Sequence, residues 1–117
     1  MTERSSLLAH RLVEVLEEKK GEDILLLDLV EQAAFTDFFV ICTGVSERTL
    51  KALSDEVRTR VKAEFEGALG AQEGDAASGW MLIDYGDVVV HLFSPEMRRY
   101  YQLEELWSAG KVLVRVK

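Results

Sequence analysis

The sequence predicts an α/β domain built on a mixed β-sheet of four to five strands with flanking helices. Residues 6–18 and 47–65 place apolar side chains at intervals of three and four, which is typical of helices that bury one face. Residues 24–29 and 37–43 are short runs that are apolar on both faces, as in strands near the middle of a covered sheet. Residues 80–93 form two strand-like segments separated by a short turn, which predicts a hairpin.

The composition indicates one compact domain at residues 1–117, with its core at about 5–107 and a tail at 108–117. The chain is 48% hydrophobic and 30% charged with a single proline, which argues against disorder. No apolar run is long enough to span a bilayer and no secretory signal opens the chain, so we expect no membrane partner. The lone Cys42 can form no intrachain disulfide, which favours a reduced, cytoplasmic setting.

The net charge of −7 is distributed unevenly along the chain. Residues 22–45 carry five acids and no base, and residues 67–107 carry seven acids and two bases. Binding to phosphates needs clustered lysine and arginine, so we expect little or no direct contact with nucleic acid. A basic protein partner fits better, because complementary charge speeds encounter and fixes orientation. The alternative is that the acidity only keeps the domain soluble.

The first half of the chain should alternate helix and strand. The helix at residues 6–18 is expected to stop at Gly21. After the second strand, Ser46 is expected to cap the next helix, because its hydroxyl can accept a backbone N–H. Residues 67–79 are rich in Gly, Ala, Ser and acids without periodicity, which predicts a mobile loop.

The hairpin is the most informative segment. With a two-residue type II′ turn at Gly86-Asp87, Trp80 pairs with Phe93 and Leu82 with His91. One face then looks like core and carries Met81, Ile83, Tyr85, Val88, Val90 and Leu92. The other mixes aromatics with an acid and a histidine, as expected of a contact surface, and carries Trp80, Leu82, Asp84, Val89, His91 and Phe93. A one-residue slip would exchange the two faces.

The C-terminal part should be helical and then extended. Pro95 suits the first turn of a helix, which is expected to run to about Trp107. Residues 111–117 alternate apolar and basic side chains and form either an edge strand or a loose tail.

The motifs that could carry chemistry are incomplete. Gly44-Val45-Ser46 could cradle a phosphate, but it lacks the glycine spacing and lysine of a phosphate-binding loop, so a turn with a helix cap is favoured. Asp84 and Asp87 straddle a turn, which makes convergence on one metal ion doubtful. We therefore expect no catalytic residues, no metal and no cofactor.

The isolated reactive side chains have simpler interpretations. His10 and His91 lie in different elements and no second cysteine exists, so no zinc ligand set is present in the sequence. His91 is expected on the sheet surface. Cys42 has no flanking charge and is interpreted as a buried hydrophobic residue.

The aromatic residues of the second half leave two interpretations open. Trp80, Tyr100, Tyr101 and Trp107 could all be core. Some could instead be interface anchors, because Trp and Tyr dominate binding hot spots. Trp80 is the best candidate, since it lies off the core face of the hairpin.

Three motifs closely resemble the ribosomal silencing factor family, also called Iojap. They are "TDFFVICTG" at 36–44, "WMLIDYGDVVVHLF" at 80–93 and "YYQLEELW" at 100–107. The resemblance implies a nucleotidyltransferase-like fold without catalytic carboxylates. It also implies binding to the large ribosomal subunit through its protein numbered fourteen, which blocks joining with the small subunit and lowers translation when nutrients are short.

The resemblance also implies partner-binding residues. In the hairpin and the C-terminal motif these are Trp80, Leu82, Asp84, Tyr85, Gly86, Tyr101, Glu104, Glu105 and Trp107, and we add His91 from the register. Two other functions stay open: a nucleotide-binding or nucleotidyl-transferring enzyme, and a dimerisation or adaptor module that uses the same face as a homodimer when free.

Overall fold

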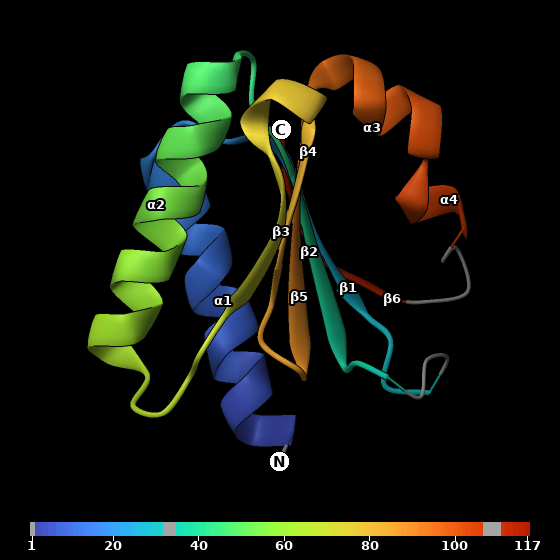
Figure 1. Ribbon diagram of the computed structural model, residues 1–117. Helices are drawn as coiled ribbons and strands as arrows, with labels where there is room; N and C mark the ends of the chain where they lie inside the picture. Colours follow the sequence, from blue (N-terminus) through green and yellow to red (C-terminus); the bar gives the residue numbers. More distant parts are fainter. Residues whose placement is uncertain (1, 32–34, 107–110) are drawn as a thin grey trace.

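The computed structural model describes residues 2–31, 35–106 and 111–117, which form a six-stranded mixed sheet with helices (Figure 1). The strand order is β3-β4-β5-β2-β1-β6; β2 and β5 are parallel and the other neighbours antiparallel. The elements are α1 (Thr2–Glu18), β1 (Glu22–Asp28), β2 (Phe38–Thr43), α2 (Glu47–Glu64), β3 (Ala71–Asp75), η1 (Ala76–Ser78), β4 (Trp80–Asp84), β5 (Val88–Phe93), α3 (Pro95–Tyr101), α4 (Leu103–Leu106) and β6 (Lys111–Val116). The predicted α/β class is confirmed, with six strands in place of four to five. The likeness to nucleotidyltransferases stays a prediction.

Helices α1 and α2 lie together on one face of the sheet, on the left in Figure 1. The main core fills the space between these helices and the sheet. Leu12 and Leu16 from α1, Leu53 from α2, and Val40 and Val90 from the central strands are all fully buried in it. The helical periodicity and the apolar runs of the sequence are therefore both explained by this layer.

The end of α1 differs from the prediction. The left-handed residue that terminates the helix is Lys20, at φ 68°, and not Gly21. The N–H of Gly21 donates to the Leu16 carbonyl at 2.7 Å, as in a Schellman cap. Glycine is needed at this position for another reason, because a Cβ on residue 21 would overlap Sγ of Cys42 on the neighbouring strand.

The predicted loop at residues 67–79 is wrong for residues 71–78, which form β3 and the 3-10 turn η1. Strand β3 pairs with β4 from Ala71 opposite Asp84 to Asp75 opposite Trp80. Every residue of β3 is exposed. An edge strand that buries no side chain shows no hydrophobic alternation, so the sequence contained no pattern that predicts it.

The predicted hairpin register is confirmed, with Trp80 opposite Phe93 and Leu82 opposite His91. The expected core face is confirmed as well, since its residues belong to the main core and Tyr85 packs partly buried against them. Gly86 has φ 85°, and the N–H of Asp87 donates to the Tyr85 carbonyl across it. That bond closes a three-residue turn, where a type II′ turn was expected.

The C-terminal segment contains two short helices and an edge strand. Gln102, at φ 47°, ends α3 by donating its N–H to the Arg98 carbonyl, and α4 follows. Trp107, the expected end of a single helix, lies outside the described residues. Residues 111–116 form the edge strand β6 against β1, which decides between the two alternatives left open for this segment. Among the described residues, no helix is long and apolar enough to cross a bilayer.

Candidate binding face

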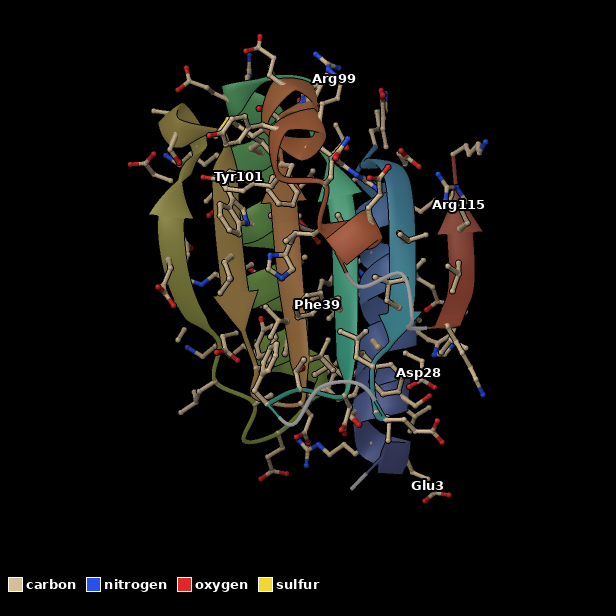
Figure 2. All side chains as sticks on the ribbon, turned by 90° about the vertical axis from the view of Figure 1, so that its right-hand side faces the viewer. Glu3, Asp28, Phe39, Arg99, Tyr101 and Arg115 are labelled. Carbon is tan, nitrogen blue, oxygen red and sulfur yellow. The ribbon has the colours of Figure 1, made fainter. Side chains whose placement is uncertain are left out.

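The face of the sheet opposite α1 and α2, here called the open face, has only α3 and α4 lying over it among the described residues (Figures 1 and 2). It carries a smaller apolar cluster of its own, formed by buried Leu25, Leu27, Leu29, Phe39, Ile41, Val89 and Phe93. Trp80 and Leu82 of β4, Met97 of α3 and Leu103 of α4 pack against this cluster and remain partly exposed. The open face is therefore apolar but incompletely covered, as in many interaction surfaces.

An aromatic row runs across the open face and consists of Tyr101, Trp80, His91, Phe39 and Phe35. Successive ring centroids lie 4.4, 5.9, 4.5 and 6.0 Å apart, distances at which aromatic rings attract one another. The ends of the row reach solvent, with Phe35 61% and Tyr101 39% exposed; Trp80 is partly exposed, and His91 and Phe39 are buried. Figure 2 shows Tyr101 and Phe39 on this face. The row thus offers two exposed aromatic ends on a rigid base.

His91 is the central ring of the row and does not reach the surface. Its side chain is 4% exposed, so the expectation that it lies on the sheet surface is wrong. The physical reason is that the open face has its own apolar cluster, which encloses the histidine between the rings of Trp80 and Phe39. Burial lowers the pKa of His91 from 6.5 to about 4, so the ring is neutral near pH 7. Phe93, also expected on the contact surface, is likewise fully buried.

A groove of about 280 Å³ lies beside Trp80, at the end of the row formed by Tyr101. Its lining comes from four elements and consists of Glu73, Gly74, Ser78, Trp80, Leu82, Met97 and Tyr101. Trp80 also stacks on Phe93 at 5.2 Å and 24°, which fixes the indole plane along one wall. The groove combines aromatic walls with one carboxylate at its rim, and such a lining favours an apolar or cationic side chain.

Asp84 lies on the open face, at the end of β4 beside the turn. Its Oδ1 accepts the N–H of Gly86 at 2.7 Å, so the carboxylate holds the turn as well as adding negative charge. Asp87, the other acid considered beside this turn, contributes its backbone: its carbonyl accepts hydrogen bonds from the N–H groups of Asp37 and Phe38. No group of three or more His, Cys, Asp or Glu side chains in the described part of the chain is placed to hold a metal ion.

The structure brings together some of the predicted contact residues and separates others. Trp80, Leu82 and Tyr101 meet at the groove, and Asp84 shares their face. Tyr85 lies on the opposite face, packed against the main core, because successive strand residues point to opposite sides. Gly86 is exposed in the turn and Glu105 is exposed on α4. The side chain of Glu104 and the whole of Trp107 lie outside what the structure describes.

Several residues of the open face were missed at the sequence level, among them Phe35 at the exposed end of the row. Glu73 lies opposite Leu82 and was assigned to the unpaired loop. Phe39 and Met97 were counted as ordinary members of an apolar strand and a helix. For Phe39 a signal existed, because a strand that is apolar on both faces needs a second cluster to cover it.

Two further expectations are confirmed near the sheet. The Ser46 side chain accepts the N–H of Thr49, so the Gly44-Val45-Ser46 segment is a turn with a helix cap. Cys42 is fully buried, and burial raises the pKa of its thiol to about 12. Neither residue contributes to the open face.

Comparison with known proteins gives consistent results. Residues 2–116 match the model of the family described as "Ribosomal silencing factor during starvation". The ribosomal silencing factor RsfS of Chromobacterium violaceum is 38% identical over 99 residues, which cover 85% of this chain and 80% of that protein. A crystal structure of a C. violaceum protein superposes with a TM-score of 0.82 at 34% identity, covering 96% of this chain and 92% of the other. A mouse protein named "Mitochondrial assembly of ribosomal large subunit protein 1" is 33% identical, and the match covers 83% of this chain and 43% of the mouse protein.

Proposed function

Because the chain belongs to the family of ribosomal silencing factors, we propose that it binds the large ribosomal subunit and blocks joining with the small subunit. The contact would be made with the large-subunit protein numbered fourteen, on the face where the small subunit docks. Translation would fall when nutrients are short. The protein would act by binding alone, without catalysing a reaction.

The observation that carries this proposal is the aromatic row on an open sheet face. Trp80 and Tyr101 are in contact at 4.4 Å, partly exposed, and supported from beneath by buried His91 and Phe93. Aromatic side chains held rigidly lose little entropy on binding, which is why they dominate interface energetics. The mouse relative is named for the ribosomal large subunit, which supports the choice of subunit.

The charges favour a basic partner. The chain carries a net charge of −7, and Glu73 and Asp84 both lie on the open face beside Leu82. A ribosomal protein that is basic enough to bind RNA would be attracted to this rim. Complementary rim charge of this kind speeds encounter more than it deepens affinity.

The block would be steric. An interface of about 800 Å² on each partner is enough for specific binding. With the open face against the large subunit, α1 and α2 would project away from it, because they lie on the far side of the sheet (Figure 1). The domain measures 34 × 33 × 23 Å, so its body would occupy space that the small subunit needs.

A pelleting assay with purified large subunits tests the surface. We expect Trp80→Ala to weaken binding by roughly thirtyfold or more, since hot-spot aromatics contribute about 2 kcal/mol. Asp84→Asn removes the charge and keeps an oxygen for the Gly86 N–H, so it should weaken binding less and leave the turn intact. The matched control is Glu17→Gln, which removes one exposed negative charge from α1, on the other face. Unchanged binding by the Trp80 variant would refute the surface.

A sucrose-gradient profile tests the block itself. Mixed subunits should give fewer joined ribosomes when the protein is present, and the Trp80→Ala variant should restore them. A profile that the protein leaves unchanged would refute subunit anti-association, even if the protein binds the large subunit.

The open face could also pair with a second copy when the protein is free. In that case sedimentation would show a dimer that dissociates as large subunits are added.

A further inference from the structure

Arg98 attaches α3 to the sheet. It is the buried residue of this helix, at 6% exposed, whereas its neighbours Met97 and Tyr101 remain partly exposed. Arginine is seldom buried unless its guanidinium is paired and hydrogen-bonded. A short helix that buries a cation against a sheet is therefore held in one orientation by directional contacts.

The guanidinium of Arg98 contacts two strands at once. Its Nη1 donates to the Asp23 carbonyl at 2.5 Å and to Oγ1 of Thr43 at 3.0 Å. Its Nη2 lies 3.7 Å from Oδ2 of Asp23. Asp23 belongs to β1 and Thr43 ends β2, so one side chain connects α3 to two neighbouring strands.

The conformation of Asp23 suits this contact. Asp23 has φ 45°, which is uncommon for a residue other than glycine, at an irregularity where the pairing of β1 with β2 shifts between Glu22 and Leu25. Here it presents its carbonyl and its carboxylate to Arg98. Its Oδ1 also lies 3.6 Å from Nη2 of Arg115 on β6. Asp23 therefore links α3 to the edge strand as well.

The contact has a consequence for the aromatic row. Tyr101 follows Arg98 by three residues, which places the two side chains on neighbouring positions of the same helix. When Arg98 is seated against β1 and β2, Tyr101 lies 4.4 Å from Trp80 and lines the groove. Any rotation of α3 about its axis would move both side chains together.

We propose that Arg98 is a positioning residue: with Asp23 it fixes α3 so that Tyr101 stays against Trp80 and the open face is formed before a partner arrives. The effect on partner binding rests on the function proposed above. Without the arginine, α3 would sample several orientations, and binding would first have to select the one that completes the row.

Nuclear magnetic resonance tests the positioning without any partner. The indole N–H signal of Trp80, assigned by its loss in Trp80→Phe, should shift in Arg98→Met, and the amides of α3 should exchange faster. The amides of α1 and α2 should keep their exchange rates. Arg99→Met is the matched control, because Arg99 is the next residue, exposed and directed away from the strands (Figure 2), and it should change neither readout.

Binding to large subunits provides the second test. Arg98→Met should weaken binding by about tenfold in the otherwise unaltered chain, and Arg99→Met by much less. In a Trp80→Ala background, Arg98→Met should add little, because Tyr101 has then already lost the ring that lies 4.4 Å from it. Arg98→Lys keeps the charge and the stem but not the planar fork, so it should fold and show a weaker form of both effects.

The outcomes separate this inference from the proposed function. An unshifted indole signal, or losses from Arg98→Met and Trp80→Ala that simply add, would overturn the positioning role. If Arg98→Met does not fold, the same two criteria apply to Arg98→Lys. Unchanged binding by Trp80→Ala would refute the binding surface of the proposed function, and the indole shift would still decide the role of Arg98 in orienting α3.

Discussion

The indole Nε1–H of Trp80 donates to Nδ1 of His91 at 3.3 Å. An indole nitrogen can only donate, so Nδ1 must hold the lone pair and the proton of the neutral ring must sit on Nε2. A charged imidazole has no acceptor and would break this bond. The partly exposed Trp80 of the groove is thus oriented by a buried histidine that has to stay neutral.

This relationship predicts a pH dependence of stability. The pKa of His91 is about 4 in the folded protein against an ordinary value of 6.5. Between these values the unfolded chain binds a proton that the folded chain does not, so stability falls as pH falls from 6.5 to 4 and is unaffected by this group above 7. We expect a loss of about 2 kcal/mol between about pH 7.5 and pH 5 from His91. Urea unfolding at the two pH values measures it.

His91→Phe is the control for that measurement. It keeps an aromatic ring in the buried site and removes the titrating group, so the difference between the two pH values should shrink by the same amount. At the higher pH the variant should be less stable by about 1 kcal/mol, because it lacks the hydrogen bond from the Trp80 indole. The loss stays this small because the indole is partly exposed and water can replace the lost acceptor. An equal pH dependence in both proteins would show that His91 is not the group responsible.

Cys42 gives a prediction about reactivity. Its thiol is fully buried and its pKa is raised to about 12, first by desolvation. Because only the thiolate attacks a disulfide reagent, the folded protein should react at the rate at which it opens. Labelling by a chromogenic disulfide reagent near pH 8 should therefore be slow in buffer and fast in denaturant. Fast labelling in buffer would contradict the burial of this side chain.

Glu73 tests the charge of the groove rim. Glu73→Gln keeps the size of the side chain and removes one negative charge opposite Leu82. We expect association with large subunits to slow by about two- to fivefold at low salt, and the difference to vanish near about 0.5 M salt, where charges are screened within a few ångströms. Surface plasmon resonance at constant magnesium measures both rates. If Glu73→Gln weakened binding only by making dissociation faster, the carboxylate would be acting through a direct contact and not by steering.

The open face shows how far the sequence could predict the site. The hairpin register was predictable because Gly86 marks the turn and alternation then fixes which residues pair. Strand β3 was not predictable, since it buries no side chain and depends on the free edge of β4 for its hydrogen bonds. The burial of His91 was not predictable either, because it depends on the rings of Trp80 and Phe39, which enclose the histidine from two different strands. Sequence periodicity describes single elements, whereas the site is formed where elements meet.

Gly21 and Cys42 give the last prediction, which concerns close approach of two elements. A Cβ on residue 21 would overlap Sγ of Cys42 and would lie 3.0 Å from the Leu16 carbonyl oxygen. Gly21→Ala should therefore destabilise the fold by about 1–3 kcal/mol, as overpacked cores do. Cys42→Ala alone leaves a small cavity and should cost about 1 kcal/mol. In the double variant the new methyl group enters the space left by the sulfur. The loss of stability in the double variant should therefore be smaller than the sum of the two single losses by at least about 0.5 kcal/mol. Thermal and urea unfolding of the four proteins gives this coupling. Strict additivity would show that the glycine is kept for the helix end and not for its contact with β2.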